Sequence, residues 1–146
     1  MNLHSFRVLD FDRIRALLAQ RAGSAQGRVW LEGLQPLTDP RAVREAQART
    51  GEARGLLQTL GREPYQDLPD PTRALATARV KGAHLERREL LDLASFIDGG
   101  LEIVLHVSRS GETPRLARLA SGVRETSEVA TAIRKAILSS GEVADD

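Results

Sequence analysis

The sequence contains no cysteine, which excludes disulfide bonds, thiolate nucleophiles and cysteine-ligated zinc. Aromatic residues make up only 3% of its 146 residues, whereas 41% are apolar. A hydrophobic core must therefore be aliphatic, which favours packing of helix on helix over sheets rich in aromatic and β-branched residues. Long hydrophobic runs are also missing, since apolar stretches such as 103–105 are far too short to cross a bilayer. The first seven residues show no signal-peptide pattern, so we expect a cytoplasmic protein without a membrane partner.

Neither positive nor negative charge predominates in the chain. The net charge is +1 with 28% charged residues, so the charge of the whole chain makes no case for binding nucleic acid. One local bias lies between residues 73 and 88, where five cations face the single acid Glu86. We call these five residues the basic strip: Arg73, Arg79, Lys81, Arg87 and Arg88. Such a strip can contact phosphate, but a solvated helix face or an acidic protein partner explains it as well.

Helix-start signals recur along the chain. The pairs Asp39-Pro40, Asp70-Pro71 and Thr113-Pro114 each place a side-chain acceptor at the N-cap and a proline at the first helical position. Proline is suited to that position because it lacks an N–H group and its φ angle is already helical. Asp10 and Ser24 are further predicted N-caps, and Asp12 suits the first turn of a helix through its charge. Three such proline pairs are hard to reconcile with a sheet protein.

The apolar spacing predicts an all-α fold, an irregular bundle of six to seven helices. We expect helices at residues 11–22, 25–34, 40–60, 71–80, 87–107, from 114 onward, and at 127–139. The pair Gly99-Gly100 is expected to break or bend the second long helix. We expect one helical segment at residues 1–138 and a flexible tail at 139–146. The side chains expected to hold the body together are Phe11, Ile14, Trp30, Leu31, Leu34 and Leu57.

The sequence contains no recognisable catalytic motif. The sequence has neither the Gly-x-x-x-x-Gly-Lys-Ser/Thr loop that cradles phosphates nor a His-Glu-x-x-His zinc motif. His4, His84 and His106 are scattered and have no carboxylate at the spacing of metal ligands. Ser24 and Thr113 are interpreted as caps because no histidine is placed to activate them. We therefore predict no catalytic residue, cofactor-binding residue or metal ligand in this chain.

Several short motifs, taken in order, resemble the start of the core or lever domain of MutS proteins. They are Leu9-Asp10-Phe11-Asp12-Arg13-Ile14, Gly27-Arg28-Val29-Trp30-Leu31, Leu34-Gln35-Pro36-Leu37-Thr38-Asp39-Pro40, Thr50-Gly51-Glu52-Ala53 and Leu68-Pro69-Asp70-Pro71. The pattern is most similar to the bacterial MutS-II family. It begins almost at Met1, which leaves no room for a mismatch-recognition domain, and the sequence has no Phe-x-Glu mismatch wedge.

This resemblance implies a larger protein with a dimeric ABC-type ATPase that uses ATP and magnesium. It also implies a clamp that holds branched DNA and, often, a C-terminal Smr nuclease domain. The family is linked to suppression of homologous recombination and to rescue of collided ribosomes. None of its catalytic motifs matches this chain, so no catalytic residue is carried over, and we expect further domains after the tail.

The segment Leu91-Asp92-Leu93-Ala94 partly resembles a Leu-Asp-Leu-Lys/Arg element of nuclease regions, but Ala94 stands where that element has a basic residue. We therefore interpret Asp92 as the polar face of a helix. Our leading hypothesis is a non-catalytic segment that links, positions or dimerises the ATPase and clamp parts. The alternatives are a stand-alone helical oligomerisation module and a nucleic-acid-binding module.

Overall fold

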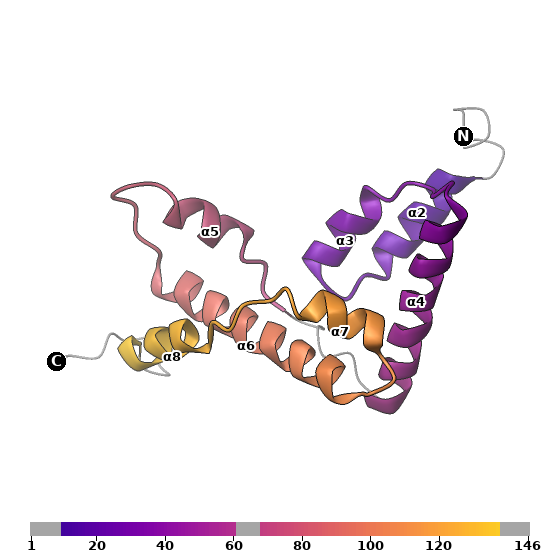
Figure 1. Cartoon of the computed structure of the whole chain (residues 1–146). Helices are drawn as coiled ribbons and strands as arrows, with labels where there is room; N and C mark the ends of the chain where they lie inside the picture. Colours follow the sequence, from indigo (N-terminus) through magenta and orange to yellow (C-terminus); the bar gives the residue numbers. More distant parts are fainter. Residues whose placement is uncertain (1–9, 61–67, 138–146) are drawn as a thin grey trace.

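A computed structural model describes residues 10–60 and 68–137, and its regular structure there is helical (Figure 1). The predicted all-α fold is confirmed. Seven α-helices lie within these two ranges: α2 (Phe11–Gln20), α3 (Ala25–Glu32), α4 (Pro40–Leu60), α5 (Thr72–Ala78), α6 (Arg87–Arg109), α7 (Pro114–Ala120) and α8 (Ser127–Ala136). The tail predicted at 139–146 falls outside the described residues.

The helices pack in pairs and do not gather around one centre. α2 packs against α3, while α6 carries α8, α7 and α5 along its length. α4 packs against α7, which lies between α4 and α6 (Figure 1). By their order in the sequence we call α2–α4 and α5–α8 the two halves of the chain, and α7 is the helix through which α4 contacts the second half.

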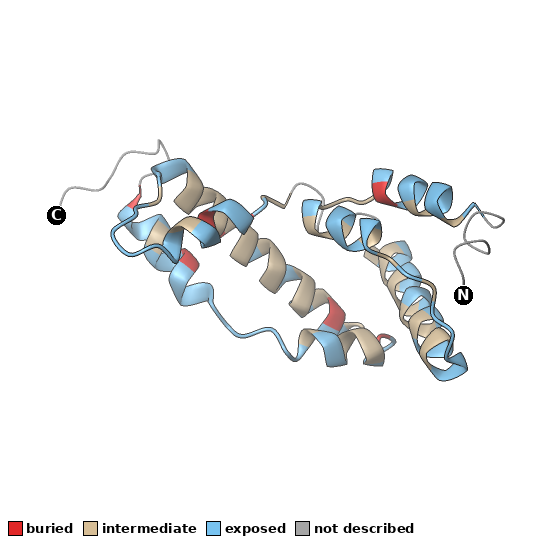
Figure 2. Cartoon of the chain, turned by 90° about the horizontal axis from the view of Figure 1, so that it is seen from above, coloured by how far each residue is buried: buried red, intermediate tan, exposed pale blue. Residues whose placement is uncertain are grey.

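Most of the few buried apolar positions are occupied by alanine. The buried apolar residues among those described are Ala19, Ala74, Ala94, Val107, Ala130 and Ile137. Ala94 is fully buried on α6, whereas no large side chain is fully buried in the described part of the chain. Figure 2 shows these positions scattered singly over the helices. Close approach of α6 to its neighbours therefore depends on alanine, since a small residue lets two helix backbones come together.

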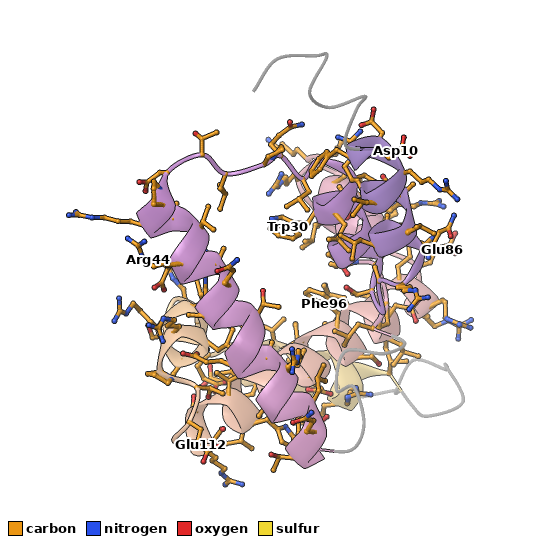
Figure 3. The ribbon with its side chains drawn as sticks, turned by 90° about the vertical axis from the view of Figure 1, so that its right-hand side faces the viewer. Asp10, Trp30, Arg44, Glu86, Phe96 and Glu112 are labelled. Carbon is orange, nitrogen blue, oxygen red and sulfur yellow. The ribbon has the colours of Figure 1, made fainter. Side chains whose placement is uncertain are left out.

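The predicted core of large side chains is wrong. Trp30 is 66% exposed and Ile14 is 49% exposed, and Trp30 projects from α3 on the side of α4 (Figure 3). The other four side chains of that set, Phe11, Leu31, Leu34 and Leu57, are only half-buried. The reason is the pairwise packing, because each apolar stripe is covered on one side and open on the other.

Most predicted helix starts are confirmed. Three predicted capping side chains accept a backbone N–H near a helix start: Ser24 from Gly27 at 3.1 Å, Asp39 from Ala42 at 2.9 Å, and Asp70 from Thr72 at 3.0 Å. The Thr72 hydroxyl also donates to Asp70 at 2.6 Å, and these two bonds hold the pKa of Asp70 below its usual range. Such caps satisfy N–H groups that have no partner inside the helix.

Two predicted caps are wrong. Asp10 adopts a left-handed conformation with φ of 49° and makes no side-chain cap bond. The buried Thr113 hydroxyl turns back and donates to the Val107 carbonyl of α6 at 2.8 Å. It satisfies one of the last carbonyls of α6, which lack partners inside the helix. The N–H groups of α7 must therefore find an acceptor elsewhere.

Of the break or bend predicted at Gly99-Gly100, the break is wrong, because α6 runs without interruption from Arg87 to Arg109. The two glycines differ in their surroundings. A Cβ at Gly99 would overlap the Leu68 side chain, which sits against the helix there, whereas a Cβ at Gly100 would meet no atom within 4 Å. Packing against α5, α7 and α8 offsets the low helix propensity of the two glycines.

These surroundings predict opposite consequences for two neighbouring substitutions. Gly100→Ala should raise the free energy of unfolding by about 0.5–1 kcal/mol, since alanine loses less backbone entropy inside a helix. Gly99→Ala should gain less or lose stability, because Leu68 must move. Urea unfolding followed by circular dichroism measures both. Equal stabilisation by the two variants would contradict the Leu68 contact.

Candidate nucleic-acid or partner interface

The basic strip lies at the α5–α6 end of the molecule (Figure 1). Arg73 lies on α5, Arg79 and Lys81 lie in the connection to α6, and Arg87 and Arg88 open α6. All five side chains are exposed. The structure therefore brings the five residues to one end of the chain, although they come from three local segments.

Two members of the strip are already paired. Arg73 Nε lies 3.5 Å from Glu89 Oε1, which ties α5 to α6, and Arg88 Nε lies 3.3 Å from Asp92 Oδ1 one turn further along α6. Exposed pairs of this kind contribute about 0–1 kcal/mol. Arg79, Lys81 and Arg87 form no ion pair with any residue that the structure describes. These three cations are the part of the strip free to meet an external anion.

The start of α6 is well defined. Glu86 and Glu89 form a capping box, in which the Glu86 N–H donates to Glu89 Oε2 at 3.0 Å and the Glu86 side chain accepts the backbone N–H of Glu89. A reciprocal cap of this kind fixes the first helical turn. The backbone that carries Arg87 and Arg88 is therefore held in place, while their long side chains remain in solvent.

The second polar site is the joint between α4 and α7, and its central residue is Glu52. Its Oε2 accepts the backbone N–H groups of Arg115 at 2.9 Å and Leu116 at 3.0 Å. Its Oε1 accepts from Arg115 Nη1 at 3.0 Å. The side chain of Glu52 is only 9% exposed. A carboxylate on one helix thus serves as the N-terminal cap of another helix, because the Thr113 side chain does not cap α7.

Charge supports this joint. Arg115 Nε also donates to Glu45 Oε2 at 3.1 Å, and Glu45 lies about two turns before Glu52 on the same face of α4. Partial burial raises the pKa of Glu52, but the hydrogen bonds from Leu116 and Arg115 outweigh it, so the pKa lies below its usual range. Glu52 is therefore held in its charged form, which accepts all three bonds.

Sequence reasoning did not single out Glu52, although the residue stands inside the motif Thr50-Gly51-Glu52-Ala53. Its partner lies 63 positions later in the chain, and no local pattern connects the two. A signal was present at the other end, since Pro114 marks a helix start. Nothing in the sequence shows which carboxylate reaches it.

Two shallow grooves border the α2–α3 pair. The larger encloses about 500 Å³ between the helices and is lined by Asp12, Arg15, Ala16, Ala19, Gln20, Arg28 and Glu32. The smaller, of about 330 Å³, lies at the turn between the helices and includes Leu68. Within residues 10–60 and 68–137, no three metal-binding side chains come together. No helix in those ranges is both long enough and apolar enough to cross a bilayer.

The chain is similar along its whole length to larger bacterial proteins. It is 32% identical over 146 residues to the protein named Endonuclease MutS2 of Symbiobacterium thermophilum, a match that covers all of this chain and 18% of that relative. Proteins of the same name from Geobacillus sp. (strain WCH70) and Geobacillus thermodenitrificans are 31% and 32% identical, with 99% of this chain and 19% of each relative covered.

The chain is homologous to one segment of the MutS2 family. The resemblance to the MutS-II family that the sequence motifs predicted is thereby confirmed. The chain spans about a fifth of the length of the curated MutS2 relatives that it matches. No protein-family model and no solved structure matches it.

The segment that partly resembles a nuclease element lies on α6 in this MutS2-like chain. Asp92 is half-buried and pairs with Arg88 one turn away, as expected for the polar face of a helix. Ala94, which stands in the position of the basic residue, is fully buried. A basic side chain at position 94 would have to displace a neighbouring helix, so this position serves packing.

The lowered pKa of Glu52 makes its stabilising effect dependent on pH. A carboxylate with a depressed pKa in the folded state stabilises fully above its unfolded pKa, about 4.3, and that effect is lost as the pH falls through the folded pKa. Glu52→Gln should therefore lower Tm most near pH 7, and its difference from wild type should shrink below about pH 4.

Thermal unfolding by circular dichroism between pH 3 and pH 7 measures this effect. Glu45→Gln, which removes a negative charge from the same helix and a single bond to Arg115, is the matched control and should lower Tm less at pH 7. A Tm difference for Glu52→Gln that stays constant or grows in acid would contradict the role of the charged carboxylate.

Proposed function

We propose that this chain is the helical part of a MutS2 protein that links and positions an ATPase and a DNA clamp, with no catalytic residue of its own. In that longer, cytoplasmic protein the ATPase uses ATP and magnesium, and two copies form a dimer. The dimer acts on branched DNA or on the ribosome. The observation that carries this proposal is that the whole chain matches one segment of MutS2 proteins five times its length.

The architecture supports a positioning role. Two long helices, α4 of 21 residues and α6 of 23 residues, meet through α7. Packed helices shift as units and do not deform smoothly, so such an arrangement can carry a rotation from one domain to another. The exposed apolar side chains of the α2–α3 end are surfaces that further domains would cover: Ile14, Leu17, Leu18, Val29, Trp30 and Leu37.

Transplantation tests this role. In the Symbiobacterium thermophilum relative, replacing the matching segment by a flexible linker of equal length should leave basal ATP hydrolysis unchanged. Stimulation by branched DNA should fall about tenfold or more, which is the size of a typical coupling between two sites. Placing the present chain in that position should restore stimulation. Full stimulation with the linker, or none with the transplanted chain, would refute the positioning role.

A second candidate function is contact with a nucleic-acid backbone through the basic strip. It is favoured by Arg79, Lys81 and Arg87, which are exposed and unpaired among the described residues. Such cations neutralise phosphates irrespective of base sequence, and the binding weakens as salt rises. Since no aromatic side chain interleaves with the strip, base stacking does not contribute.

Charge reversal tests this contact. Lys81→Glu combined with Arg87→Glu should weaken binding of a branched DNA and reduce the slope of log affinity against log salt by about 2. Arg124→Glu combined with Lys135→Glu, exposed cations outside the strip, makes the same change of net charge and should have a smaller effect. Equal losses from the two pairs would show a general charge effect and would overturn the assignment of the strip.

A further inference from the structure

We infer that Glu52 is a latch, a side chain that sets the angle between α4 and the second half of this chain, α5–α8. The fixed angle follows from the structure of this chain, and only its use in positioning other domains rests on the proposed function. It rests on the geometry of the α4–α7 joint, where one carboxylate caps a helix that belongs to the other half. Glu52 is thus a positioning residue and touches no substrate.

Few other contacts hold the two halves together. Apart from the α4–α7 packing, the other side-chain hydrogen bond between them within the described residues joins Gln26 Nε2 to Asp70 Oδ1, at 3.4 Å and in solvent. Leu68 approaches the α2–α3 turn in the smaller groove. None of the residues of α4 is buried, so apolar packing does not by itself fix the orientation of this helix.

The opposite is true inside the second half. α6 packs against both α8 and α7. Arg134 of α8 donates from Nε and Nη2 to Asp98 of α6 at 3.1 and 2.6 Å. Buried Ala94, Val107 and Ala130 lie on these helices. α6, α7 and α8 therefore move as one body, and a change in the angle of α4 must occur at its junction with α7.

The latch acts mainly through the backbone of α7. Two of the three bonds to Glu52 come from main-chain N–H groups, which are present whatever side chain stands at Arg115 or Leu116. Bonds from N–H groups at a helix start to a charged carboxylate are about twice as strong as bonds between neutral groups. Glutamine at position 52 keeps the size of the side chain and one acceptor oxygen, but it loses the negative charge that strengthens both backbone bonds, and its amide nitrogen cannot accept from Arg115.

Because the chain has no cysteine, two can be introduced for spin labels without interference. Gln47→Cys on α4 and Glu102→Cys on α6 are both exposed sites. Double electron–electron resonance on the doubly labelled 146-residue chain should give one narrow distance distribution. Adding Glu52→Gln should broaden that distribution at least twofold or shift its maximum, with helix content unchanged by circular dichroism.

Two matched variants test the mechanism. Glu45→Gln removes a bond to the Arg115 side chain only, and Arg115→Ala removes both side-chain partners but keeps the two backbone N–H groups. Both should retain the narrow distribution. If Glu52→Gln lowers helix content, Glu52→Asp, which keeps the charge but is too short to reach α7, provides the same readout.

An unchanged distribution in a folded Glu52 variant would overturn the latch. Broadening by Arg115→Ala as large as that caused by Glu52→Gln would overturn its backbone mechanism. Because the distances are measured on this chain alone, either result leaves the transplantation experiment to decide the positioning role separately.

Discussion

The arrangement of this chain depends on one carboxylate. Glu52 on α4 satisfies the first backbone N–H groups of α7 at 2.9 and 3.0 Å, a task that the helix's own flanking residue, Thr113, leaves undone because its hydroxyl is bonded to α6. N–H groups at a helix start need an acceptor, so the capping requirement of α7 becomes an attachment point for α4. The same hydrogen bonds therefore cap α7 and attach it to α4.

The packing elsewhere explains why a single polar joint has such weight. The buried positions are mostly alanine, and large apolar side chains such as Trp30 remain mostly exposed. Helices that pack in pairs bury only one side of each apolar stripe. Little apolar contact therefore remains between one pair and the next. The positioning role proposed above would use these long helices and the few contacts between the pairs.

Helix existence and position were predictable from local signals. The spacing of apolar residues and the proline pairs placed α4 at 40–60 as observed, and Ser24 and Asp39 cap as predicted. Contacts between distant residues were not predictable. The capping of α7 by Glu52, the pairing of Arg73 with Glu89 and the seat of Leu68 against Gly99 each join positions with no pattern between them. The family resemblance was carried by ordered motifs and did not need the structure.

The helical class, most helix boundaries, the absence of recognisable catalytic motifs and the similarity to MutS2 proteins were all predictable without coordinates. Each of them depends on side chains that lie a few positions apart in the chain. The tertiary structure decided three other matters: that α6 continues through Gly99-Gly100, that Trp30 and Ile14 are not core residues, and that Glu52 joins the halves. The physical reason is the same for all three. The burial of a side chain, the continuity of a helix and the capping of its first turn all depend on which helix lies alongside. Helical periodicity predicts that a helix has an apolar face, but it does not predict which surface covers that face.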